Sequence, residues 1–257
     1  MQVVGLRRSF AITLIPFLVL LFGALPSATA DNEEIPSSLA DDIINKYLQA
    51  KSQDNELRGA SMEVEISAQV PKLNESGTLR ALRKISRVGQ ITYRQIAFQG
   101  ANFVKKEIIA RYLDAEKQEQ GDQDIGITPE NYKFKYKGQV PSQANSPAFV
   151  FQLTPRKKKL GLFKGEMWID CKTYLPVFEK GRLVKNPSVF FKKVDFRRGF
   201  NIQNGLAVPT YLVSTIDTRL VGKIEINISF SKFAQGRDTE ADEDAADSAA
   251  TRQSMLQ

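Results

Sequence analysis

The chain has 257 residues, of which 42% are hydrophobic, and a formal net charge of +7. It contains no histidine and a single cysteine, Cys171. These counts exclude histidine-dependent catalytic devices, the commonest zinc and iron sites, and any intramolecular disulfide. The length is enough for one large domain with its own core or for two small ones, and the basic balance suits either an acidic partner or solubility alone.

The N-terminal segment has the three parts of a secretory signal peptide. Arg7 and Arg8 form a basic start, an apolar run covers residues 10–25, and Ala28 to Ala30 offers the small residues of a cleavage site. The run is shorter than the roughly 20 residues that span a bilayer, which argues against an uncleaved anchor. We expect a signal peptide over residues 1–30, cleavage after Ala30, and a periplasmic mature protein. Asp31 stands where a lipid-attached cysteine would be needed, so a soluble protein is expected.

Two segments have the apolar spacing of amphipathic helices. Residues 38–48 place apolar side chains at 39, 43, 44, 47 and 48, after a serine suited to capping. Residues 101–120 carry an apolar stripe that includes Phe103, Ile108 and Tyr112 and end before Gly121. The second helix is interpreted either as part of the core or as a movable cover over a ligand cavity.

The rest of the chain alternates with the period of two that is typical of half-buried strands. The alternating segments cover residues 61–70, 78–88, 91–98, 132–136, 149–154, 163–171, 175–183, 189–198, 200–203, 208–216 and 220–233. Short turns such as Asn204-Gly205 join them, which favours an antiparallel meander of nine to eleven strands. The fold class is therefore mainly β with α (α+β). A flat sheet of this size would expose an apolar face, so we expect one strongly curved sheet covered by helices.

The composition divides the chain into a single domain over residues 31–234 and a tail over residues 235–257. The tail is acidic, rich in alanine and free of aromatic residues. Such a segment buries too little apolar surface to fold, and we predict that it is disordered.

One hairpin resembles that of a known family. Residues 165–177 read Gly-Glu-Met-Trp-Ile-Asp-Cys-Lys-Thr-Tyr-Leu-Pro-Val, similar to the G-x-x-W-I-D-x-x-T-x-L-P-V hairpin of LolA-like proteins, the outer-membrane lipoprotein-sorting and lipoprotein carrier family. Residues 204–209 resemble the later G-x-x-V-P hairpin of the same family. The motifs cover residues 163–233, and only the order of elements supports the resemblance upstream.

The resemblance implies a half-open β-barrel with helices across its mouth and an apolar cavity for acyl chains. It implies a soluble carrier that takes acyl chains of lipoproteins or lipids toward the outer membrane, with inner-membrane donor and outer-membrane acceptor proteins as partners. No position matches the family's gating arginine. The expected cavity lining consists of apolar residues on single strand or helix faces: Phe103, Ile108, Tyr112, Phe149, Phe151, Met167, Ile169, Ile226, Ile228 and Phe230. The alternative for each of them is ordinary core packing.

Other interpretations stay open. The same fold could form an envelope sensor that detects lipid or lipoprotein and signals to a partner protein. The basic runs at 156–159, 192–193 and 197–198 suit either an anionic membrane surface or solvated turns. An enzyme would have to use carboxylates, with Glu166, Asp170 and Asp195 as the candidates, and a purely structural envelope protein is a further alternative. We expect no enzymatic activity, no cofactor, no metal and no nucleic-acid partner.

Overall fold

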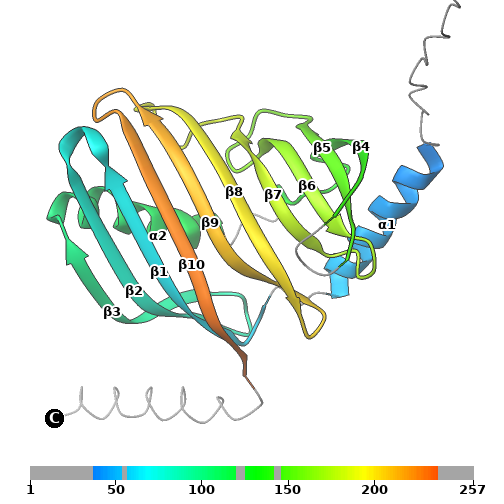
Figure 1. The fold of residues 1–257 in the computed structure, drawn as a ribbon, viewed down its shortest axis with the longest axis horizontal. Helices are drawn as coiled ribbons and strands as arrows, with labels where there is room; N and C mark the ends of the chain where they lie inside the picture. The colour runs from blue at the N-terminus through cyan, green and yellow to red at the C-terminus, as the bar shows by residue number, and fades with distance from the viewer. Residues whose placement is uncertain (1–36, 54–56, 120–124, 142–145, 237–257) are drawn as a thin grey trace, which may run out of the picture. The chain divides into compact units, whose positions relative to one another are not determined.

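The computed structural model describes residues 37–53, 57–119, 125–141 and 146–236 (Figure 1). The described residues form one antiparallel sheet of ten strands, with two helical segments packed on it. The predicted signal peptide with its cleavage site, and the tail beyond residue 236, lie outside the described residues.

The sheet is a meander whose first and last strands meet in its middle. From edge to edge the strands follow the order β3-β2-β1-β10-β9-β8-β7-β6-β5-β4. The chain runs outward to the edge strand β3, crosses to the other edge at β4, and returns strand by strand to β10 beside β1 (Figure 1). The strands are β1 (Ala60–Val70), β2 (Glu75–Ile85), β3 (Ile91–Gly100), β4 (Tyr132–Val140), β5 (Ala148–Pro155), β6 (Phe163–Asp170), β7 (Pro176–Leu183), β8 (Phe191–Gln203), β9 (Leu206–Thr218) and β10 (Lys223–Gln235).

The prediction of a strongly curved, half-open barrel is wrong. The edge strands β3 and β4 do not pair with each other, and the sheet is neither strongly curled nor closed (Figure 1). Alternation along a strand determines which side chains share a face, but it does not determine how far the sheet curls. Here helices cover the apolar face, so its burial does not require closure.

One face of the sheet, called the inner face below, carries the apolar side chains. In β1 the buried residues Met62, Val64, Ile66, Ala68 and Val70 alternate with more exposed polar ones, as predicted. In β10 the buried isoleucines at 224, 226 and 228 alternate in the same way. The opposite, more polar face is called the outer face.

The first helix, α1 (Ser37–Gln53), confirms the predicted helix and extends it by several residues. It buries Ile43, Ile44 and Tyr47, which repeat at helical spacing, against strands β4 to β7. Its exposed side carries an i,i+4 ion pair of 2.8 Å between Asp42 and Lys46.

The second predicted helix begins with a widened turn. A π-helical segment, η2 (Val104–Ile109), precedes α2 (Ala110–Glu119). The wider turn brings Val104, Ile108 and Ile109 together onto the buried side. In Figure 1, α2 lies behind β1, β2 and β10, where these side chains join the inner-face core.

The inner face holds two apolar clusters. The first cluster lies under η2 and α2 and consists of Val64, Ile66, Ala68, Val70, Leu79, Ala81, Val104, Ile108, Ile109, Val194, Ile216, Ile224, Ile226 and Ile228. The second cluster lies under α1 and consists of Ile43, Ile44, Tyr47, Ile127, Tyr132, Phe149, Phe151, Leu153, Leu162, Phe163, Met167 and Ile169. The half-buried Leu183 packs against both clusters.

Candidate functional site

The ten residues expected to line a cavity lie on the inner face but not in one place. Phe103, Ile108, Tyr112, Ile226, Ile228 and Phe230 belong to the first cluster or pack against it. Phe149, Phe151, Met167 and Ile169 belong to the second cluster, where their exposed fractions do not exceed 9%. In the described state these side chains pack against one another and against the two helices.

An ion pair lies on the inner face near the helices. The Arg198 guanidinium on β8 donates to the Glu179 carboxylate on β7, with Nη2 and Nε lying 2.5 and 2.7 Å from Oε2. The Glu179 side chain is 4% exposed and the Arg198 side chain 39% exposed. The ion pair therefore places charge, partly solvated at Arg198, among the apolar side chains of this face.

The charge of Arg198 acts on residues of both helices. Desolvation alone lowers the pKa of Arg198, but the charge and hydrogen bond of Glu179, together with Tyr47 on α1 and Tyr112 on α2, raise it above its ordinary value. The guanidinium also lies 5.8 Å from the Phe196 ring and 5.7 Å from the Phe200 ring. Arg198 thus stands between the two helix-covered parts of the sheet.

A second ion pair ties α2 to the sheet. Arg83 of β2 lies on the inner face, is 8% exposed, and donates from Nη2 to Glu116 of α2 at 2.9 Å. The Tyr93 hydroxyl donates to the other Glu116 oxygen, and burial followed by the Glu116 charge raises the pKa of Tyr93 far above its ordinary value. Arg83 also lies 5.9 Å from the ring of Phe230.

Sequence reasoning did not identify these ion pairs as features of the inner face. The alternation within residues 78–88 does not by itself determine whether the face with Leu79, Ala81, Arg83 and Ile85 is buried. The structure buries it, so Arg83 lies within an apolar row. Arg198 was interpreted as part of a basic run, although it alternates in step with Val194 and Phe196 and so lies on the same face of the strand. The sequence did contain a signal for both arginines: each is a charged residue in a row of alternating apolar residues.

The helices leave the apolar face incompletely covered. Several large side chains pack beside the clusters yet remain partly exposed, namely Tyr93, Phe98, Phe103, Tyr112, Leu183, Phe191, Leu212 and Phe230 around the first cluster and Phe134, Tyr136, Tyr174 and Phe196 around the second. Burying such surface is favourable by about 25 cal/mol per Å². The inner face therefore keeps some partly exposed apolar surface.

Two hollows of the described residues lie on the outer face instead. The larger, of about 710 Å³, is bounded by strands β5 to β8. Its lining combines the polar side chains of Gln152, Lys164, Glu166, Lys180, Arg182 and Asp195 with the apolar residues Leu183, Val184 and Phe196. The smaller, of about 340 Å³, is bounded by β1, β8, β9 and β10, and its lining includes Glu65, Ser67, Arg197, Tyr211, Val213 and Asn227. Both linings combine charged and apolar residues.

The three candidate carboxylates each have a structural partner. Glu166 forms a 2.9 Å ion pair with Lys180. Asp195 lies 2.6 Å from Arg182 and 2.5 Å from Lys193, and although desolvation raises its pKa, these hydrogen bonds lower it below the ordinary value.

Asp170 is 2% exposed and accepts three hydrogen bonds within the β6–β7 turn. Among the described residues, no group of three or more His, Cys, Asp or Glu side chains is placed to hold a metal ion. None of the described helices has the length and apolar character that crossing a membrane requires.

Comparisons with known proteins give structural likenesses only. No family model matches the chain, and no curated protein matches it. The solved structure of a domain described as an outer-membrane lipoprotein-sorting protein, from Vibrio parahaemolyticus, has a TM-score of 0.44 at 11% identity, covering 80% of this chain and 98% of its own.

Two further solved structures are more distant. A LolA-superfamily protein from Nitrosomonas europaea has a TM-score of 0.37 at 12% identity, covering 79% of this chain and 96% of its own. The MucA/MucB complex from Pseudomonas aeruginosa matches with a TM-score of 0.27 at 11% identity, covering 77% and 99%. TM-scores this low carry no argument about function. The chain has structural matches to LolA-superfamily proteins and to MucB, at low sequence identity.

Proposed function

We propose that this protein is a soluble periplasmic carrier that binds the acyl chains of lipoproteins or lipids on the inner face of its sheet and moves them toward the outer membrane. The observation that carries the proposal is the incompletely covered inner face. Phe98, Phe134 and Leu212 stay partly exposed there, beside the two helix-covered clusters. The role needs a dry apolar surface and no catalysis.

The energetics of acyl binding suit such a face. Burial of each methylene contributes about 0.8 kcal/mol, so a chain of roughly 14 carbons gains on the order of 10 kcal/mol before binding costs. An acyl chain would bind the sheet in place of helix side chains. It would displace Ile43, Ile44 and Tyr47 of α1, or Ile108 and its neighbours on η2. Because the cover and the guest compete for the same face, release remains possible.

Two neighbouring residues of β9 provide a matched test of the binding face. Leu212 points to the inner face, whereas Val213 points to the outer face and lines the smaller hollow there. We expect a fluorescent fatty-acyl probe to bind the wild-type protein, Leu212→Asn to weaken binding about tenfold, and Val213→Asn to leave it within about twofold, since one buried apolar side chain is worth about 1.5–3 kcal/mol. Equal thermal unfolding of the two variants would confirm that they fold.

Two results would refute the proposal. One is failure of the wild-type protein to take up the probe, together with native mass spectra free of acylated species after purification from an envelope fraction. The other is loss of probe binding in Val213→Asn but not in Leu212→Asn, which would place the guest in the outer hollow.

The alternative function is an envelope sensor with the same acyl-binding face. A sensor would form a stable complex with one partner protein when lipid is bound, whereas a carrier would hand its cargo on. Affinity purification from periplasm with and without the probe separates the two, since only a sensor gains a stoichiometric partner with the probe.

The predicted export is part of the same proposal. If the signal peptide is removed after Ala30, N-terminal sequencing of the protein from a periplasmic fraction should begin at Asp31. An intact N-terminus in the membrane fraction would contradict it.

A further inference from the structure

Three turns at one end of the sheet are fastened to one another. They are residues 71–74 between β1 and β2, residues 184–192 leading into β8, and residues 218–223 between β9 and β10. The Lys72 ammonium donates to the Leu220 carbonyl at 3.2 Å, and Arg219 donates from Nε to the Val189 carbonyl at 3.1 Å and from its backbone N–H to the Phe190 carbonyl at 2.9 Å. We call this surface the turn rim.

The turn rim exposes large apolar side chains to solvent. Val189 is 81% exposed, Leu220 66%, Phe190 55% and Leu73 43%. These are four of the nine most exposed large hydrophobic side chains of the described residues. Because the turns are hydrogen-bonded to each other, the four side chains are held together at one end of the sheet. A single exposed hydrophobic side chain is ordinary, but a group of them indicates an interaction surface.

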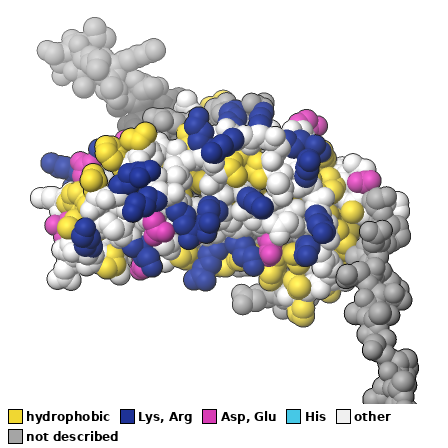
Figure 2. Space-filling model, turned by 90° about the horizontal axis from the view of Figure 1, so that it is seen from above, with side chains coloured by type: hydrophobic (Ala, Val, Ile, Leu, Met, Phe, Trp, Pro, Cys, Tyr) yellow, Lys and Arg dark blue, Asp and Glu magenta, His cyan; other side chains and the backbone are white. Residues whose placement is uncertain are grey.

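The apolar side chains of the rim are surrounded by positive charge. The three turns hold five basic residues, Lys72, Lys185, Lys192, Arg219 and Lys223, and no acidic one. The neighbouring turn between β5 and β6 adds the basic run 156–159 and Leu160, and is attached through the Val184 N–H, which donates to the Leu162 carbonyl at 3.0 Å. Figure 2 looks onto this end and shows Lys and Arg side chains gathered among hydrophobic ones, with acidic side chains sparse.

We propose that the turn rim docks on an anionic phospholipid bilayer. The exposed apolar tips would enter the interface between headgroups and acyl chains, and the surrounding ammonium and guanidinium groups would pair with lipid phosphates. Charge complementarity selects this partner over a neutral protein surface. The proposal goes beyond acyl binding and does not depend on it, because the rim lies at the strand ends and the acyl-binding face lies under the helices.

The test measures vesicle binding by sedimentation, using phosphatidylcholine vesicles with and without phosphatidylglycerol. The wild-type protein should bind the anionic vesicles and be released as the salt concentration rises. Lys185→Glu/Lys192→Glu should weaken this binding by more than about tenfold. Lys135→Glu/Lys137→Glu, which makes the same charge change at exposed positions of the edge strand β4, should stay within about threefold of wild type.

An apolar pair tests the tips separately. Val189→Ser/Leu220→Ser should weaken binding to anionic vesicles by about tenfold or more, whereas Val88→Ser, 76% exposed at the opposite end of the sheet, should not. All variants share one N-terminus, so any contribution of the apolar segment at residues 10–25 cancels in the comparison.

Three outcomes would overturn the docking proposal. They are no preference of the wild-type protein for anionic vesicles, equal weakening by the rim and β4 charge pairs, or unchanged binding in both rim variants. Acyl-probe uptake by the folded rim variants, measured alongside, separates failure of docking from failure of the carrier function.

Discussion

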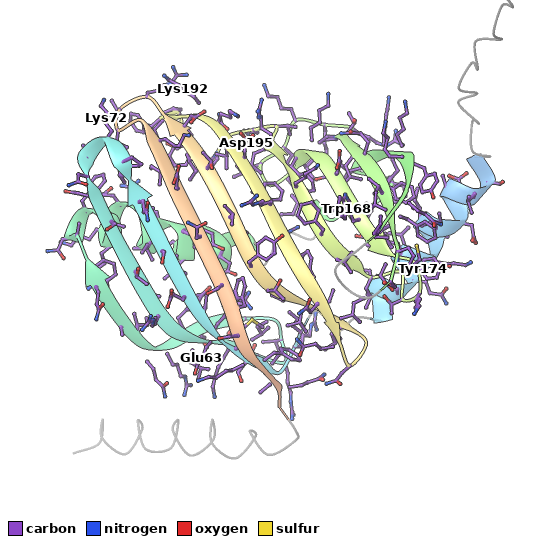
Figure 3. All side chains as sticks on the ribbon, in the orientation of Figure 1. Glu63, Lys72, Trp168, Tyr174, Lys192 and Asp195 are labelled. Carbon is purple, nitrogen blue, oxygen red and sulfur yellow. The ribbon has the colours of Figure 1, made fainter. Side chains whose placement is uncertain are left out.

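Asp170 shows how one side chain of the Trp-Ile-Asp motif stabilises a hairpin. Its Oδ1 atom accepts hydrogen bonds from the Lys172 and Thr173 N–H groups and from the Thr173 hydroxyl, at 2.8 to 3.0 Å. The turn also holds Tyr174 at a positive φ of 58°. Trp168 packs against Phe178 with ring centroids 4.9 Å apart (Figure 3 labels Trp168 and Tyr174). The motif therefore has a structural role in the turn between β6 and β7.

Replacing Asp170 should destabilise the protein without touching the proposed binding face. Asp170→Ala leaves three donors without their acceptor and should lower the free energy of unfolding by about 2 kcal/mol. Asp170→Asn keeps an acceptor oxygen and should cost about 1 kcal/mol or less. Urea unfolding monitored by circular dichroism measures both. Equal losses in the two variants would show that the negative charge, rather than the hydrogen bonds, matters.

Tyr47, which is buried, and Tyr93, which is half-buried, should make the protein sensitive to alkali. Burial is the first cause that raises the pKa of Tyr47 and of Tyr93, and nearby carboxylates add to it. Since each pKa is higher in the folded state than in the unfolded chain, folding favours the protonated hydroxyl. This stabilisation is fully present below the unfolded pKa of about 10 and is lost as the pH rises above it, at up to about 1.4 kcal/mol per pH unit for each tyrosine.

Tyr47→Phe should therefore flatten the fall of stability above pH 10. The measurement is urea unfolding at a series of alkaline pH values, with the slope of stability against pH as the readout. Tyr93→Phe, at the other tyrosine with a raised pKa, should flatten the slope as well. A wild-type slope in Tyr47→Phe would contradict this explanation.

At the scale of elements, the paired strands β6 and β7 approach each other too closely to accommodate a side chain at one position. Gly165 pairs with Gly181, and a Cβ at Gly165 would lie 2.0 Å from the Lys180 carbonyl oxygen. Backbone atoms paired in a sheet have no room to shift. The glycine in the hairpin motif thus serves strand pairing rather than a turn.

Gly165→Ala should be among the most destabilising small substitutions in the sheet. We expect a loss of about 3 kcal/mol or more, because the strands must separate to accept the methyl group. Gly138→Ala, where a Cβ meets nothing within 4 Å, should cost about 1 kcal/mol from its positive φ of 108°. Thermal unfolding of both variants checks the difference. A Gly165→Ala protein as stable as Gly138→Ala would show that the strand pair adjusts.

Elements were predicted more reliably than their arrangement. The alternation in β1 and β10 and the Asn204-Gly205 turn, both of whose residues have positive φ, are confirmed because these signals are local. Segments 189–198 and 200–203 join into β8, with a bulge at Gly199 that local alternation interprets as a break. The π-helical start of the second helix was missed, since a 3.6-residue pattern does not distinguish it from an α-helical turn.

At the scale of the whole molecule, strand order separates residues that alternation had grouped. Phe151, Met167 and Ile226 are all buried on the inner face, yet β5 and β6 lie far across the sheet from β10. Strand order depends on long-range pairing, which a single sequence does not encode locally. The predicted lining therefore lies in two clusters under separate helices.

Acyl binding should loosen both helices while leaving the sheet intact. Hydrogen–deuterium exchange with the fatty-acyl probe should rise in residues 37–53 and 104–119, because side-chain contacts hold these segments to the inner face. Strands β1 and β10, paired in the middle of the sheet, should keep their protection. Faster exchange in the central strands, with unchanged exchange in the two helices, would contradict a mechanism in which the helices cover the binding face.

The pairing of β1 with β10 also has a consequence for when the protein can fold. Ala60 pairs with Gln235, so the centre of the sheet joins the earliest and the latest parts of the domain to leave the ribosome. Until the last strand has emerged, β1 lacks one of its neighbours. Strands β1 to β3 and strands β4 to β9 are then joined only by the connecting chain. The complete sheet therefore cannot form until the whole domain has been synthesised, and β1 must wait for its last neighbour.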